Sequence, residues 1–386
     1  MRTPPAALLL LAAGFLSGCG GADRGLRLVT LTDLTGPHAA IGQGIRMAVE
    51  LALADRRAEL LDAGWRIGLA SFDAFESSPD LPDAVSRIAA QADVFCAVAH
   101  TSTDGNIAAA QILNAAGIPV LLPAETAPLP SGSGLAETAW LSADDPTRGG
   151  AIANWAAKSF ADILLLMDSG RHAQAVGGGF LKRAGELGVS VSISPFPADD
   201  DPSGWALSIH RASPKLIVFS GSSSTAGTLL GSLENLEYSG AFFFAESEAD
   251  DSLPEVFSSD RIRIYFSPAA EQSEAFLRPG HFAVAFRGAY DADAPDLSGL
   301  GYDAAAICLQ SLLLAGNTGA DPTTLRMEIA AEWRTDFMLH GLTGEYSPAR
   351  RPCRTSIYVR SDDSPTGWQS VSPLADSGCG RVAGGG

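Results

Sequence analysis

Basic side chains are scarce in this sequence. Its 386 residues include 26 lysines and arginines against 44 aspartates and glutamates, so the formal net charge is 26 − 44 = −18. Proteins that bind nucleic acids or anionic membrane surfaces depend on clustered lysines and arginines. The charge balance therefore argues against nucleic acid as a partner and disfavours an anionic membrane surface.

The sequence also lacks the motifs that identify common enzymes. Residues 221–225 (GSSST) fail the G-x-S-x-G pattern at the last position, and there is no Walker A motif, no G-x-G-x-x-G after a strand and no H-E-x-x-H. Its six histidines are scattered, and its five cysteines form no CxxC pair. We therefore predict no catalytic activity, no metal site and no cofactor.

Long apolar runs are rare, and the one at the N-terminus has a specific form. A short positive start, Met1-Arg2, precedes an apolar run over residues 6–16 that is too short to cross about 30 Å of hydrocarbon. This pattern predicts a signal peptide over residues 1–18. Residues 16–19 (LSGC) resemble a bacterial lipobox, which implies acylation of Cys19 and a lipid-anchored protein in the periplasm or at the cell surface. The alternative is a cleaved soluble protein.

Four cysteines remain after Cys19. Cys96 and Cys308 lie in apolar segments, where free cysteines are usually small buried hydrophobic residues. Cys353 and Cys379 flank the C-terminal strand segment in an oxidising compartment, so we expect a disulfide between them.

Strand and helix patterns alternate along most of the chain, which is the βαβα arrangement of parallel sheets covered on both faces. A Pro-, Gly- and Ser-rich stretch over residues 128–145 separates two series. We predict the strands of the first series over 26–33, 65–73, 94–101 and 118–122, and those of the second over 163–168, 189–193, 216–220, 241–245 and 261–266. The fold class is therefore α/β with two lobes.

Two later helices, over about 280–290 and 301–315, have no strands of their own nearby, so they must pack on a sheet already made. We expect them to return to the first lobe, which makes both lobes discontinuous. The predicted limits are a linker over 19–25, a first lobe over 26–141 plus 272–341, a second lobe over 142–271 plus 342–375 and a tail over 376–386.

Three loops at the predicted carboxyl ends of strands carry hydroxyl residues and glycine. They cover residues 35–42 (TGPHAAIG), 100–105 (HTSTDG) and 123–128 (PAETAP). Open α/β sheets bind ligands at this edge, and hydroxyls beside a helix N-terminus suit an anionic head group such as a carboxylate. The alternative is ordinary helix capping, which favours the same residue types.

Five motifs follow one another along the chain in the order found in a known protein family. Residues 33–37 (DLTGP), 41–44 (IGQG), 115–124 (AAGIPVLLPA), 300–304 (LGYDA) and 341–344 (GLTG) resemble the leucine-binding family of periplasmic solute-binding proteins. These are the type I receptors of branched-chain amino acid ABC importers. The resemblance implies two Rossmann-like lobes joined by a three-strand hinge, a bound amino acid or related small carboxylate or amide, and ABC permease subunits as partners.

The resemblance also implies binding residues. Thr103, next to Ser102, falls where the family places a hydroxyl that holds the ligand's α-carboxylate. Ala124 and Thr126 match the positions whose carbonyl and hydroxyl receive the α-ammonium. Two positions depart from the family pattern, because Ile41 and His172 stand where many members have an aromatic residue and a Tyr-Gly pair.

The second lobe's acidic partner for the ammonium has no single match. Glu246 and Glu248 are candidates, and each is equally well explained as a solvated surface acid. Asp104 would repel a carboxylate unless it turns outward to cap the helix, which we expect. These departures leave a second hypothesis open, a binding-only sensor or envelope scaffold that keeps the fold but does not serve transport.

Overall fold

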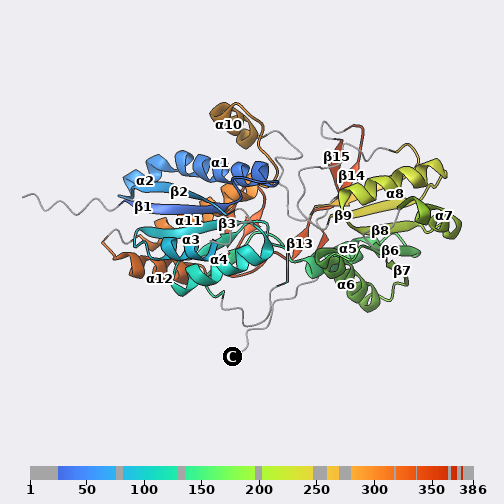
Figure 1. Ribbon diagram of the computed structural model, residues 1–386, viewed down its shortest axis with the longest axis horizontal. Coiled ribbons are helices and arrows are strands. Elements are labelled where there is room, and N and C mark those ends of the chain that lie inside the picture. The colour runs from blue at the N-terminus through green and yellow to red at the C-terminus, as the bar shows by residue number, and fades with distance from the viewer. Residues whose placement is uncertain are drawn as a thin grey trace, which may run out of the picture.

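The computed structural model describes residues 25–74, 81–128, 135–195, 202–246, 259–268, 280–316, 319–335, 337–363, 367–371 and 375–376. These residues form two α/β lobes that lie side by side (Figure 1). One lobe has a five-stranded sheet in the order β2-β1-β3-β4-β5, and the other has a seven-stranded sheet in the order β15-β14-β10-β9-β8-β6-β7. The predicted fold class is confirmed.

The first sheet is parallel throughout. Its strands are β1 (Leu26–Thr32), β2 (Ile67–Asp73), β3 (Val94–His100), β4 (Val120–Leu122) and β5 (Thr138–Trp140). The helices of this part of the chain are α1 (Ala39–Asp55), α2 (Arg57–Asp62), α3 (Leu81–Ala89) and α4 (Thr103–Ala115). Strand β3 is buried along nearly its whole length, as expected for a central strand covered on both faces.

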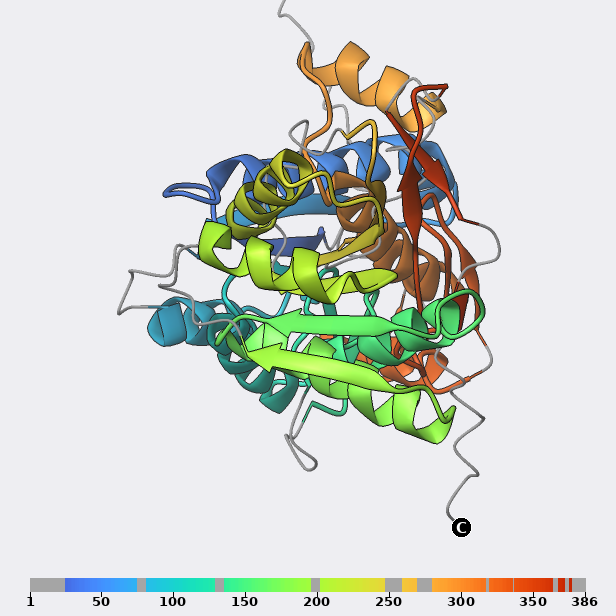
Figure 2. The same ribbon diagram turned by 90° about the vertical axis from the view of Figure 1, so that its right-hand side faces the viewer.

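The second sheet is parallel except at one edge. Strands β6 (Ile163–Met167), β7 (Val191–Pro195), β8 (Leu216–Gly221), β9 (Ala241–Glu246) and β10 (Arg263–Ser267) run parallel. Strand β14 (Tyr358–Arg360) pairs antiparallel with β10, and β15 (Trp368–Ser370) pairs antiparallel with β14; Figure 2 shows both in red at the edge. The helices are α5 (Asp145–Ala156), α6 (Arg171–Glu186), α7 (Pro202–Ala212) and α8 (Ser223–Asn235).

The chain returns to the first lobe after β10. Helices α10 (His281–Tyr290), α11 (Ser298–Ala315) and α12 (Pro322–Glu332) follow, and α11 packs against α1 and β3. At Gly301 a Cβ atom would lie 3.0 Å from the Cα atom of Ile45, so glycine lets α11 approach α1 closely. Helices α10 and α11, which were expected to return to the first lobe, therefore lie on it. The residue limits predicted for the two lobes stay a prediction.

Short two-stranded sheets accompany the later passages of the chain between the lobes. Strand β11 (Leu339–His340) pairs with β12 (Glu345–Tyr346), and β13 (Arg354–Thr355) pairs with β16 (Ala375–Asp376), both antiparallel. The chain leaves the first lobe after β5, returns between β10 and α10, and leaves again between β12 and β14. Three passages thus join the lobes.

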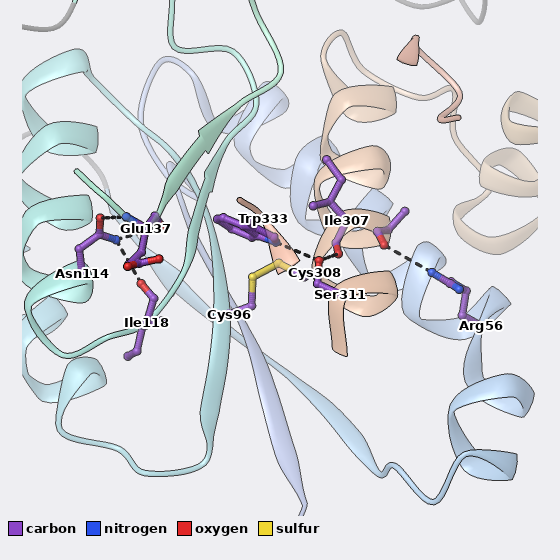
Figure 3. The surroundings of a disulfide bond; sticks show 10 residues. Arg56, Cys96, Asn114, Ile118, Glu137, Ile307, Cys308, Ser311 and Trp333 are labelled. Atoms are coloured by element: carbon purple, nitrogen blue, oxygen red, sulfur yellow. Dashed lines mark hydrogen bonds between the residues drawn. A yellow bond between two sulfur atoms is a disulfide. The ribbon is translucent and has the colours of Figure 1, made fainter. Parts of the chain in front are cut away.

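The prediction that Cys96 and Cys308 are free was wrong. Their side chains are fully buried in the first core and form a disulfide, with 6.1 Å between the Cα atoms (Figure 3). The bond forms because α11 lies on β3 and brings together two residues 212 positions apart. Their burial was correctly expected, but the contact between the two segments was not.

Cys353 is also disulfide-bonded, and its partner lies outside the described residues. Cys379 lies outside the described residues too, so the Cys353–Cys379 pairing stays a prediction. The pairing of Arg354 with Asp376 supports it, because this register brings the segments next to the two cysteines alongside each other. The signal peptide and Cys19 lie outside the described residues as well.

Helix α11 is apolar and long enough, by length and composition, to cross a membrane. In the structure 72% of this helix is buried inside the first lobe. It therefore serves as a core helix, covered by α1 on one side and by β3 on another.

Candidate functional site

The carboxyl ends of the strands of the two sheets meet at a junction between the lobes. The hydroxyl of Thr126, after β4, lies 3.5 Å from Nδ1 of His172, in the first turn of α6. The same nitrogen lies 2.7 Å from Oδ2 of Asp145, the first residue of α5. Two residues predicted from the sequence to bind ligand, one in each lobe, are thus brought together.

The close packing of α5 on α6 places His172 over Asp145. At Gly149 a Cβ atom would lie 1.9 Å from the carbonyl oxygen of Val176, and at Gly179 it would lie 2.1 Å from that of Pro146. Side chains at these positions would force the helices apart. Gly149 and Gly179 therefore allow the close packing of α5 on α6, whereas Gly177 lies against Met167 of β6 and a Cβ at Gly178 would meet open space.

Asp145 anchors the second-lobe side of the junction. It is fully buried and forms an ion pair with Arg148, with Oδ1 and Nη1 3.1 Å apart. Its second oxygen faces His172. The helix starts here because Asp144 accepts the backbone N–H of Thr147 and Pro146 occupies the first turn. Breaking a buried pair of this kind leaves an uncompensated charge, so the geometry is strongly held.

Glu125 is the main junction residue that the sequence interpretation missed. It is 3% exposed, and its Oε1 accepts hydrogen bonds from the Thr103 hydroxyl at 3.2 Å and from the Ala127 N–H at 2.9 Å. Its Oε2 accepts one from the side-chain amide of Asn106 at 3.0 Å. The local sequence shows only an acid three residues after the end of β4, and the donors that hold it are brought there by the fold.

Arg351 was also missed. Its guanidinium donates to the carbonyl oxygens of Ser142 at 3.0 Å, of Ala127 at 3.1 Å and of Glu125. Burial lowers the pKa of Arg351, and the nearby carboxylates of Asp144, Glu125 and Asp145 act in the opposite direction. One arginine from the last passage between the lobes thus fixes both loops that follow β4 and β5.

The remaining residues predicted in the first lobe have other surroundings. Ser102 caps α4, because its hydroxyl accepts the N–H of Gly105 at 3.2 Å. Asp104 is not the cap, contrary to our expectation; its side chain is 92% exposed and lies 3.9 Å from Arg171 of the other lobe. Ile41 is 2% exposed and packs in the core, because it lies on the inner face of α1, so the structure does not bring it to the junction.

The structure describes the surroundings of the other predicted residues only in part. Ala124 is partly buried against the first core. Glu246 ends β9, opposite Gly221 of β8, and its side chain is not described. Glu248 lies outside the described residues. Ser222, after β8, caps α8 by accepting the N–H of Thr225.

The loop after β1 is held by Asp73 at the end of β2. Its carboxylate accepts the N–H of Leu34 at 2.9 Å and the hydroxyl of Thr35 at 2.6 Å. Nearby, His100 ends β3, and burial, followed by the charge of His38, lowers its pKa to about 4. The histidine that ends β3 is thus neutral near pH 7.

A separate cavity of about 270 Å³ lies at the amino end of β10 and therefore away from the junction. It is lined by Ser259, Asp260, Arg261, Ile262, Arg263, Ile264, Arg360 and Asp362. Among the residues that the structure describes, no group of three or more His, Cys, Asp or Glu side chains is arranged to hold a metal ion.

The sequence profile of a family described as periplasmic binding protein matches residues 25–354. The chain belongs to the periplasmic binding protein family. Members serve ABC importers as substrate-binding proteins, and the structural neighbours share this type I fold. A search of curated protein sequences finds no significant match.

This periplasmic binding protein is similar to several solved structures. A leucine binding protein, LivK, from Thermotoga maritima has 18% identity and a TM-score of 0.67, with 91% of this chain and 99% of that chain covered. A branched-chain amino acid binding protein, LivJ, from Streptococcus pneumoniae in complex with isoleucine has 17% identity and a TM-score of 0.66, with 90% and 99% covered. A solute binding protein from R. palustris in complex with benzoate has 16% identity and a TM-score of 0.64, with 91% and 96% covered.

Proposed function

We propose that this chain is the extracytoplasmic solute-binding subunit of an ABC importer. It takes a small polar organic molecule, an amino acid or a related carboxylate or amide, between its two lobes. The contact between Thr126 and His172 carries the proposal, because it joins the carboxyl ends of the two sheets where open α/β folds bind ligands. Membership of the family supports it, as do the isoleucine and benzoate bound by two of the structural neighbours.

Binding acts through closure of the lobes about the three passages that join them. A solute that contacts residues of both lobes favours the closed state over the open one, and the closed surface is what the permease recognises. No bond in the solute is made or broken. His172 serves this role well, because Asp145 holds its ring while Thr126 approaches from the other lobe.

The test combines identification of the solute with a measurement of closure. Mass spectrometry of molecules released from the purified protein, and thermal denaturation against amino acids, carboxylates and amides, identify ligands. X-ray scattering then measures whether the ligand reduces the radius of gyration. We expect a saturable rise in melting temperature together with compaction.

Paired variants locate the site. The double variant Thr126→Val, His172→Ala removes the contact between the lobes, and we expect it to weaken binding at least about tenfold, or about 1.4 kcal/mol. His281→Ala lies on the exposed start of α10 and serves as the control. Unchanged affinity in the double variant, or no stabilisation by any compound in the library, would contradict the proposal.

The lipid anchor is a separate part of the proposal. Cleavage before Cys19 and acylation of its thiol tether the protein to a bacterial membrane beside its permease. Mass spectrometry of the N-terminal peptide and the Cys19→Ser variant test this. The anchor is contradicted if the mature protein begins at another residue, carries no lipid and is found in the soluble fraction.

A further inference from the structure

The carboxylate of Glu125 occupies an anion-binding position built by the first lobe. Its donors are the hydroxyl of Thr103, the side-chain amide of Asn106 and the N–H of Ala127. Thr103 and Asn106 lie in the first turn of α4, where the helix dipole favours negative charge. Two donors from α4 and one from the loop after β4 therefore converge on a carboxylate that belongs to the protein.

This filled position adjoins the contact between the lobes. Glu125 directly precedes Thr126, whose hydroxyl lies 3.5 Å from His172. The residue that fills the position is thus next in the chain to the contact between the lobes, and its carboxylate already accepts the Thr103 hydroxyl.

The buried arginines of the junction are committed to other partners. Arg148 pairs with Asp145, and Arg351 donates to three backbone carbonyls. The carboxylates that act on Arg351 are those of Asp144, Glu125 and Asp145. Three carboxylates thus lie around Arg351 at the junction. An incoming carboxylate would lie beside that of Glu125, to which the Thr103 hydroxyl, the Asn106 amide and the Ala127 N–H already donate.

We propose that Glu125 is a built-in anion that fills the carboxylate position of the first lobe and selects a solute presenting an ammonium, guanidinium or amide group there. An ionised carboxylate has about four lone-pair positions, and the described donors use three, so a donor on the solute completes the set. This inference rests on the proposed function and narrows the expected solutes to amines and amides.

Matched triples of compounds test the selectivity. Each triple shares one side chain: leucine, leucinamide and isopentylamine, then phenylalanine, phenylalaninamide and phenethylamine. Isothermal titration calorimetry compares wild type with Glu125→Ala, and Glu186→Gln, an exposed change on α6, is the control. We expect wild type and control to bind an amide or amine at least about tenfold tighter than its amino acid, and Glu125→Ala to reverse that preference.

Chemical rescue tests the anion position without the natural solute. Deletion of the Glu125 side chain beyond Cβ leaves room for a small carboxylate among the same three donors. Acetate is therefore expected to raise the melting temperature of Glu125→Ala in a saturable way, and to leave wild type and Glu186→Gln unchanged. Equal responses of all three proteins would overturn the built-in anion.

The two experiments separate this inference from the proposed function. If the triples bind with compaction but the free amino acids bind as tightly as their amides, the chain is a solute-binding protein and the selectivity is wrong. If no compound of either class binds or closes the lobes, both fail. Rescue by acetate together with reversed preference in Glu125→Ala supports the inference in full.

Discussion

Cys96 of β3 and Cys308 of α11 are joined by a disulfide that closes the first lobe across 212 residues of sequence. Both side chains are fully buried within one hydrophobic cluster. The bond therefore connects a central strand to a helix that reaches it only after the chain has passed through the other lobe.

Removal of this disulfide is expected to destabilise the first lobe. A cross-link limits the freedom of the unfolded chain, and for a loop of this length the loss is about 2–5 kcal/mol. The Cys96→Ala, Cys308→Ala variant should therefore unfold at lower denaturant concentration. Equal midpoints for wild type and variant under oxidising conditions would refute this.

Asp303 is expected to make stability fall as pH rises. The side chain is fully buried in α11 and accepts the N–H groups of Leu342 at 2.8 Å and Thr343 at 2.7 Å. Burial raises its pKa to about 6, above 3.8, although these hydrogen bonds oppose the shift. The folded protein thus holds this proton more tightly than the unfolded chain, so the contribution is present below about pH 4 and is lost as pH rises through about 6.

Denaturant unfolding of wild type and Asp303→Asn between pH 4 and 7 measures this effect. Wild type should lose up to about 3 kcal/mol relative to the variant across that range. Asp321→Asn is the control with the opposite slope, because hydrogen bonds from Thr324 lower the pKa of that exposed acid. Parallel curves for wild type and Asp303→Asn would show that Asp303 does not titrate in this window.

His100 is expected to make the stability of the folded protein fall as pH falls, the opposite direction to Asp303. Its folded pKa of about 4 lies below the ordinary value of 6.5, so the folded state binds this proton less readily than the unfolded chain. Its contribution is complete above about pH 6.5 and is lost as pH falls through 4. His100→Gln should therefore gain roughly 3 kcal/mol relative to wild type between these limits.

The same unfolding measurement, made from pH 7 to 4, checks the prediction for His100. His281→Gln, an exposed change at the start of α10, is the control. We expect His281→Gln to follow wild type. A His100→Gln curve parallel to both would contradict the assignment.

Arg351 is expected to be needed for stability. Its guanidinium joins three carbonyl oxygens on the loops after β4 and β5. Arg351→Ala leaves these acceptors without their donor and should cost about 3 kcal/mol. Arg351→Lys should not restore the loss, because an ammonium does not reproduce the guanidinium fork. Arg211→Ala, at an exposed site, should unfold at the wild-type midpoint.

The sequence predicted the sheets well where apolar runs are continuous. Strands β1, β3, β6 and β8 are buried on both faces, so their composition alone marks them. Helix α12 was missed although Asp321 and Pro322 form a clear helix start, with the Asp321 carboxylate accepting the N–H groups of Thr323 and Thr324. Strands β14 and β15 are only three residues each, too short for alternation to show.

The site was predictable only in part. Thr126, in the loop after β4, and His172, in the first turn of α6, were both predicted to bind ligand, and they lie next to each other. The role of Glu125 could not be read from local pattern, because it depends on donors 19 and 22 residues earlier in the chain. The Cys96–Cys308 bond was hidden for the same reason. Long-range contacts of this kind follow from topology rather than from periodicity.

The place of α11 in the core also governs how the protein matures. The strands of the first sheet are synthesised first, yet the helix that covers β3 and α1 emerges only after strands β6 to β10 of the second sheet. Contacts between such distant segments form slowly, and until then the apolar faces of the first sheet are exposed to chaperones and proteases. The lobe that is encoded first therefore lacks its core helix until the five parallel strands of the second sheet have been synthesised.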